Sequence, residues 1–103
     1  MNLAEFGHFS DPALLILSSL ADGPKHGYSM MSDIETMTGV RLGPGTLYGA
    51  LARLENSGLI QAMPAIGRRR PYRLTAKGAA ALREQLVLLQ KLASTGLKRL
   101  SAQ

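Results

Sequence analysis

The chain has 103 residues, of which 46% are hydrophobic, and this length and composition predict one folded domain around one core rather than a disordered chain. It contains no cysteine, which excludes disulfides, thiolate metal sites and cysteine nucleophiles and fits a reducing compartment. The net charge is +5, and residues 61–103 hold nine basic residues against Glu84 alone, so the balance favours a polyanionic partner such as nucleic acid or an anionic membrane surface.

The first predicted helix begins at Asp11-Pro12, because aspartate caps free helical amides and proline suits the first turn. Its apolar residues recur at helical spacing, and they are Leu14, Leu15, Ile16, Leu17, Leu20 and Ala21. A stripe this wide indicates a helix that is buried on more than one side. Asp22-Gly23-Pro24 ends it, with Gly23 as the left-handed cap.

Two more helices are predicted before residue 60. The second covers residues 27–38 and ends at Gly39, and its candidate inward face is Tyr28, Met31, Ile34 and Met37. The third begins at Gly43-Pro44, covers about 44–57 and ends at Ser57-Gly58. Its inward stripe is Leu47, Ala50, Leu51 and Leu54.

The remainder predicts a hairpin and a long helix. Residues 59–63 and 71–75 alternate between apolar and polar side chains, as strands do, and residues 64–70 between them form a basic tip. Thr75 then caps a final helix over about 76–100.

This order predicts a mostly α protein with a small β-hairpin, namely a winged helix-turn-helix followed by a long C-terminal helix. We expect a DNA-binding domain over residues 1–78, with the wing at about 59–75, and a dimerisation helix over 76–103, all within one compact domain. Leu3, Phe6 and Phe9 are compatible with an extra helix over residues 1–10.

The third helix is the candidate recognition helix. With its leucines inside, its outer face holds Gly45, Thr46, Tyr48, Gly49, Ala52 and Arg53. Small residues let a helix backbone approach the floor of the major groove, and hydroxyl groups can bond phosphates or base edges. Tyr48 could instead be a half-buried packing residue. The face holds few Arg, Asn or Gln, so shape and phosphate contacts should outweigh base readout.

The hairpin tip carries the densest positive charge, at Arg68, Arg69 and Arg70, and Arg73 extends the same edge. Guanidinium groups enter narrow minor grooves and pair with phosphates, although a charge run can also be a merely solvated loop. Lys25 and Tyr28 flank the start of the second helix, where free amides and a cation would suit a phosphate. His8 and His26 are the only histidines, so we expect no metal site and no cofactor.

The final helix has more apolar surface than its own domain needs. One stripe follows a four-three-four rhythm, and its members are Leu82, Leu86, Leu89, Ala93, Leu97 and Leu100. Leu88 and Leu92 add a second stripe. Two stripes favour a homodimer, with wrapping of the helix on its own core as the alternative.

Several spaced motifs resemble the PadR-like family of winged helix-turn-helix transcriptional regulators, in the short form with one C-terminal dimerisation helix. The matching residues lie within about 11–80 and include His26-Gly27-Tyr28, Gly45-Thr46-Leu47-Tyr48, Tyr72-Arg73-Leu74-Thr75 and Lys77-Gly78. The resemblance implies transcriptional control, usually repression, by a homodimer on double-stranded DNA, with contacts around Thr46 and Tyr48 and from the wing.

Some PadR-like relatives bind aromatic or drug-like effectors at the dimer centre, so the resemblance also implies a small hydrophobic effector. The chain departs from that pattern because it has no tryptophan and its final helix lacks large aromatic residues. Gly49 also stands where larger residues are common in the family.

Other functions fit the residues less well. An enzyme would need paired carboxylates, a nucleophile with its base, or a phosphate-binding glycine loop, and none is present, so no catalytic residue is assigned. The apolar run 13–17 is too short to cross a bilayer, and there is no basic amphipathic helix or signal peptide, so we expect a cytoplasmic protein with no membrane partner. A winged helix used only for protein–protein contact is the alternative to DNA binding.

Overall fold

The short first helix, α1 (Pro12–Ser19), lies at the centre of the computed structural model, which describes residues 11–103. Asp11 caps it by accepting a hydrogen bond from the Ala13 amide at 3.0 Å. Leu15, Ile16 and Leu17 are successive residues, yet each is at most 6% exposed. Because successive residues point in different directions around a helix, α1 is buried on several sides, as its sequence predicts.

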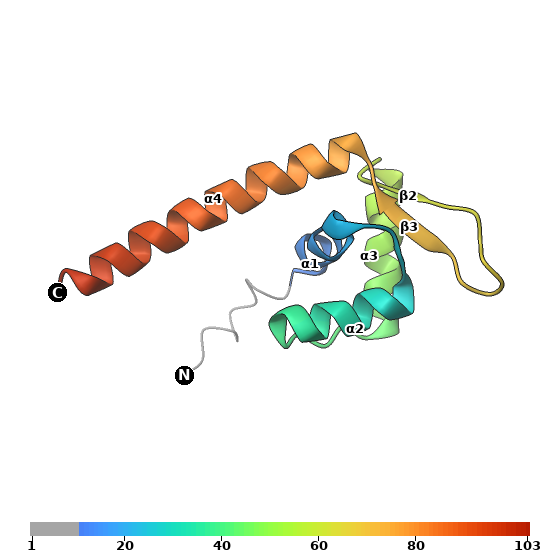
Figure 1. The fold of residues 1–103 in the computed structure, drawn as a ribbon, viewed down its shortest axis with the longest axis horizontal. Helices are drawn as coiled ribbons and strands as arrows, with labels where there is room; N and C mark the ends of the chain where they lie inside the picture. Colours follow the sequence, from blue (N-terminus) through green and yellow to red (C-terminus); the bar gives the residue numbers. More distant parts are fainter. Residues whose placement is uncertain (1–10) are drawn as a thin grey trace.

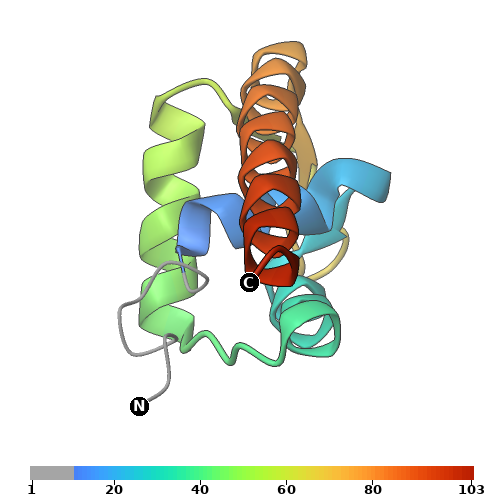
Figure 2. The ribbon, with the colours of Figure 1, turned by 90° about the vertical axis from the view of Figure 1, so that its left-hand side faces the viewer.

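The other helices pack around α1. A single 3₁₀ turn, η2 (Leu20–Asp22), follows it, and α2 (Gly27–Thr38), α3 (Pro44–Asn56) and α4 (Ala76–Ser101) each contact α1. Figure 2, which looks along α4, shows α1 passing behind it with α2 and α3 on opposite sides. Chain reversals occur where glycine was expected to end a helix, as at Gly39, whose left-handed backbone has φ +77°.

Three short strands form one antiparallel sheet in the order β1-β3-β2. β2 (Ile60–Ala62) and β3 (Pro71–Leu74) are the predicted hairpin, with Ile60 opposite Leu74. β1 (Lys25–His26) was not predicted, and it pairs with β3 so that Lys25 lies opposite Tyr72. This pairing fixes the start of α2 directly against the hairpin. We call residues 60–74 the wing.

The predicted core face of α2 is confirmed at Ile34 and wrong at Tyr28 and Met37. The buried residues of α2 are Gly27, Met30 and Ile34, whereas Tyr28 is 73% and Met37 is 46% exposed. Met31 is only partly buried. The physical reason is that α1 and α3 contact α2, whose buried side carries residues 27, 30 and 34. The spacing of apolar residues alone does not distinguish that side from the one that carries Met31 and Met37. The inward stripe of α3 is confirmed, since Leu47, Ala50, Leu51 and Leu54 are all buried.

The wing and the end of α4 extend in opposite directions from the helical body, as Figure 1 shows, and give the molecule principal extents of 56 × 29 × 20 Å. Thr75 caps α4 by accepting a hydrogen bond from the Gly78 amide at 3.0 Å. Among the described residues, no helix is both long and apolar enough to cross a membrane. The helix considered over residues 1–10 lies outside the described part of the chain.

Gly78 anchors the start of α4 against the sheet. A Cβ on Gly78 would lie 1.9 Å from the carbonyl oxygen of Leu59, which is a backbone atom and already accepts the Thr75 amide at 3.1 Å. We expect Gly78→Ala to destabilise the fold by about 3 kcal/mol or more, because α4 must shift away from the sheet. Urea unfolding measures this loss. Gly96→Ala is the control, since nothing lies within 4 Å of its added Cβ, and equal stability of the two variants would contradict the close packing.

Candidate nucleic-acid interface

The outer face of α3 is available to a partner along most of its predicted length. Gly45, Thr46 and Arg53 are exposed, Gly49 is half-buried and Tyr48 is 51% exposed. The N-terminal half of the helix therefore combines small residues and two hydroxyl groups on an open surface, and Arg53 adds one cation in the last turn. Tyr48 also packs, because its ring lies against Gly27 of α2, and a contact of its exposed side with DNA stays a prediction.

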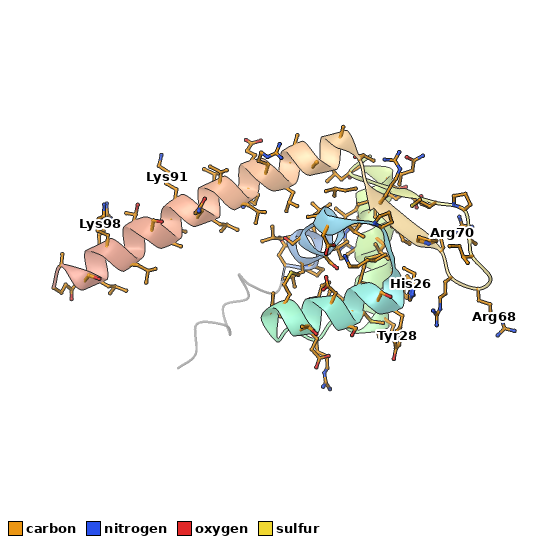
Figure 3. All side chains as sticks on the ribbon, in the orientation of Figure 1. His26, Tyr28, Arg68, Arg70, Lys91 and Lys98 are labelled. Carbon is orange, nitrogen blue, oxygen red and sulfur yellow. The ribbon has the colours of Figure 1, made fainter. Side chains whose placement is uncertain are left out.

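A cleft of about 380 Å³ separates α2 and α3 from the wing. Apart from Gly27, each residue that lines the cleft carries either an aromatic ring or a positively charged or titratable nitrogen. The lining residues are His26, Gly27, Tyr28, Tyr48, Arg68, Arg69, Arg70 and Tyr72. No carboxylate is among these lining residues. Figure 3 shows His26 and Tyr28 at the α2 end and Arg68 at the tip of the wing across from them. The fold thus brings three distant sequence motifs to one cationic, hydroxyl-rich cleft.

The three wing arginines differ in their surroundings. Ile66 and Arg69 exchange two backbone hydrogen bonds, at 2.7 and 3.1 Å, and Gly67 between them has φ +63°, so the tip is an ordered tight turn. Arg70 Nη1 donates to the Met63 carbonyl at 3.0 Å, across the base of the tip. Arg68 and Arg69 donate no side-chain hydrogen bond to any described residue and point their charge outward. The sequence analysis missed Ile66, which is 74% exposed beside them.

Two other predicted cations are held by the protein itself. Lys25 Nζ donates to the carbonyl of buried Ser19 at 2.5 Å and to the carboxylate of Asp22. The Lys25 ammonium holds the pKa of the Asp22 carboxyl below its usual value through this hydrogen bond and through charge. Arg73 bonds the Gln61 side chain on the neighbouring strand. Lys25 thus fastens β1 to the end of α1, and we leave it out of the interface proposed below.

Two further side chains, His26 and Tyr72, line the cleft. His26 caps α2 by accepting the Ser29 amide through Nδ1 at 3.4 Å, and its Nε2 lies 2.9 Å from Ser29 Oγ. Burial raises the pKa of the Tyr72 hydroxyl, and the nearby Glu55 carboxylate raises it further. Tyr72 therefore stays protonated at neutral pH and can donate a hydrogen bond. No group of three or more His, Cys, Asp or Glu suited to a metal ion occurs among residues 11–103.

The chain was compared with protein families, curated proteins and solved structures. Residues 16–84 match the Transcriptional regulator PadR-like family. The transcriptional regulator Rv3488 of Mycobacterium tuberculosis is 42% identical over 83 residues, covering 78% of this chain and 77% of that protein. The chain belongs to the PadR-like family.

The chain is similar to two further proteins, and the second is itself a PadR family regulator. An uncharacterized 37.1 kDa protein in transposon TN4556 of Streptomyces fradiae is 49% identical over 76 residues, which are 74% of this chain but only 22% of that protein. The crystal structure of a PadR family transcriptional regulator from Eggerthella lenta has a TM-score of 0.77 at 28% identity, covering 95% of this chain and 88% of that one. The winged-helix fold class and its family are therefore confirmed, and the chain is a transcriptional regulator.

The final helix of this PadR-like regulator shows which part of its apolar stripe is free. Leu82 was predicted at a dimer interface, but it is 5% exposed and belongs to the core of its own chain, where it docks α4. Leu89 is half-buried. The other predicted interface residues are exposed in the chain, and they are Leu86, Ala93, Leu97 and Leu100. Leu88 and Leu92 are also exposed, at 56% and 68%.

Removing the Lys25 ammonium should weaken the fold itself. We expect Lys25→Met to lower the free energy of unfolding by about 1 kcal/mol, because the Ser19 carbonyl loses its charged donor while the methionine keeps most of the apolar stem. Thermal or urea unfolding measures the change. Lys91→Met is the matched control, since Lys91 lies exposed on α4, pointing away from the body in Figure 3. Equal stability of the two variants would contradict an anchoring role for Lys25.

Proposed function

We propose that this PadR-like regulator binds double-stranded operator DNA sequence-specifically as a homodimer and represses transcription. The observation that carries the proposal is the cationic cleft of about 380 Å³, in which Tyr28 and Tyr48 lie across from the three wing arginines. In a winged helix-turn-helix, the second helix of the motif enters the major groove. The wing then reaches an adjacent minor groove or its phosphates.

The charges on the two sides of the cleft suit different parts of a duplex. Arg68 and Arg69 are exposed on an ordered turn, so they can enter a narrow minor groove or pair with phosphates with little loss of backbone freedom. Thr46 and the hydroxyl of Tyr48 are hydrogen-bond donors on the α3 side, where Gly45 allows close approach. Arg70 and Arg73 complete the positive edge while bonding Met63 and Gln61. We therefore assign phosphate contacts mainly to the wing and groove-floor contacts to α3.

Binding of DNA is tested by fluorescence anisotropy on duplex DNA from upstream of the regulator's own gene, beside a scrambled duplex, at several salt concentrations. We expect tight binding to the native duplex that weakens steeply with salt. Arg69→Ala should reduce the slope of log K against log salt by about 1, because one phosphate contact is lost. Lys25→Met removes the same charge from an internal site and should leave the slope unchanged.

The outcomes separate the competing functions. Equal, weak binding to both duplexes would contradict sequence specificity at this operator. Absence of binding to either duplex at low salt would overturn the proposal and support the alternative, a winged helix that contacts proteins. An unchanged slope for Arg69→Ala would remove the wing from the interface.

The homodimer is proposed from the free face of α4. Leu97 and Leu100 are 66% and 69% exposed, and the helix beyond residue 90 is exposed at every position to residue 103. A second copy covering this stripe would bury the apolar side chains and pair two recognition helices for a pseudo-palindromic site. The small hydrophobic effector stays a prediction. Two grooves of about 510 and 310 Å³ that meet at Leu86 are of a size that such a ligand would need.

We expect Leu97→Asp to convert the dimer to monomers, because a carboxylate would be buried in an apolar interface. Sedimentation velocity at micromolar concentration measures the change. Leu97 is a cleaner position than Leu89, which also packs on its own chain. Lys91→Asp is the control, since Lys91 lies exposed on the charged side of α4, away from the leucines of both apolar stripes. A Leu97→Asp variant that still sediments as a dimer would contradict the assignment.

A further inference from the structure

Gly27 and Tyr48 come from different helices and occupy one another's space. Gly27 is buried at the first position of α2, and Tyr48 lies on the exposed face of α3. A Cβ on Gly27 would lie 2.6 Å from Tyr48 Oη, 2.9 Å from Cζ and 3.0 Å from Cε1. The end of the tyrosine ring therefore fills the volume that any other side chain at residue 27 would need.

The backbone itself does not require glycine at this position. Gly27 directly follows the capping residue His26 and has no positive φ, unlike Gly23, Gly39, Gly58 and Gly67. Alanine is a better helix former than glycine in a helix by up to about 1 kcal/mol. The neighbour that excludes a side chain is the Tyr48 ring, so the reason for glycine lies in the position of that tyrosine.

We propose that Gly27 is a positioning residue for DNA recognition, which fixes the side chain of Tyr48 on the surface that meets DNA. This inference rests on the proposed DNA binding. The end of the Tyr48 ring occupies the space that a side chain at residue 27 would take, and Tyr48 lines the cleft together with Tyr28 and the wing arginines. The contact fixes the position of the Tyr48 hydroxyl relative to the wing arginines. It therefore helps α3 and the wing to contact the same duplex.

The effect of replacing a glycine depends on which atoms the new side chain would meet. At Gly78 the clash is with the backbone, which cannot move without shifting a strand, whereas at Gly27 it is with the far end of one side chain. An alanine at residue 27 would therefore push the Tyr48 ring aside and leave the fold nearly intact. Because no cation is lost, DNA affinity should fall without a change in its salt dependence.

A double-mutant cycle on the full chain tests the proposal, with the duplex from upstream of the regulator's own gene as the probe. We expect Gly27→Ala and Tyr48→Ala each to weaken binding by about tenfold. Gly27→Ala should have no further effect in the Tyr48→Ala background, because the displaced ring is already absent. The salt slope and the melting temperature should stay close to those of the parent protein. Thr36→Ala, an exposed substitution on α2 at a residue that does not line the cleft, is the control and should bind normally.

Three results would overturn the inference. Normal affinity of Gly27→Ala would show that DNA does not require this position of Tyr48. An equal loss in both backgrounds would show that Gly27 acts through its own backbone. A melting temperature lowered equally in both backgrounds would show that the glycine serves the fold alone. A parent protein that binds no duplex defeats the proposed function itself, and the inference falls with it.

Discussion

The rest of the structure depends on the burial of α1 on several sides. Leu15, Ile16 and Leu17 are nearly excluded from solvent, and full burial of each such side chain contributes about 1.5–3 kcal/mol relative to exposure. Because α2, α3 and α4 all contact this one short helix, its packing sets how the recognition helix meets α2 and where α4 departs. The polar surface proposed to face DNA is thus held by apolar packing behind it.

Polar interactions at the edge of this apolar core join α1 to the neighbouring elements. Ser19 is buried, and its hydroxyl donates to Asp33 of α2 at 2.6 Å while its carbonyl accepts the Lys25 ammonium. These bonds join the end of α1 to α2 and to the sheet that carries the wing. The basic residues therefore fall into two groups. Some, such as Lys25, donate their hydrogen bonds to groups of the same chain. Others, such as Arg68 and Arg69, are exposed to solvent. Only the second group offers its full bonding capacity to a polyanion.

Local sequence signals were sufficient for the helices of this protein and insufficient for contacts between them. The leucines of α3 follow helical spacing closely enough to identify its buried face, and Thr75 is a strong capping residue. By contrast, β1 has two residues, so no alternation can reveal it, and Met30 and Met31 are chemically alike, so spacing alone placed the α2 face one residue away. The seating of Tyr48 on Gly27 depends on how two helices cross, and a single sequence carries no direct signal of that crossing.

The projecting half of α4 makes the fraction of protein able to bind an operator depend on the protein concentration. From residue 91 onward every residue of the helix is exposed in the described part of the chain, and short isolated helices are only marginally stable in water. A partner that covers the stripe would supply the missing stabilisation, so helix formation and association would become one equilibrium governed by mass action. The cellular concentration of the regulator would then act as an input signal, and dilution of the regulator by cell growth would release operators without any ligand.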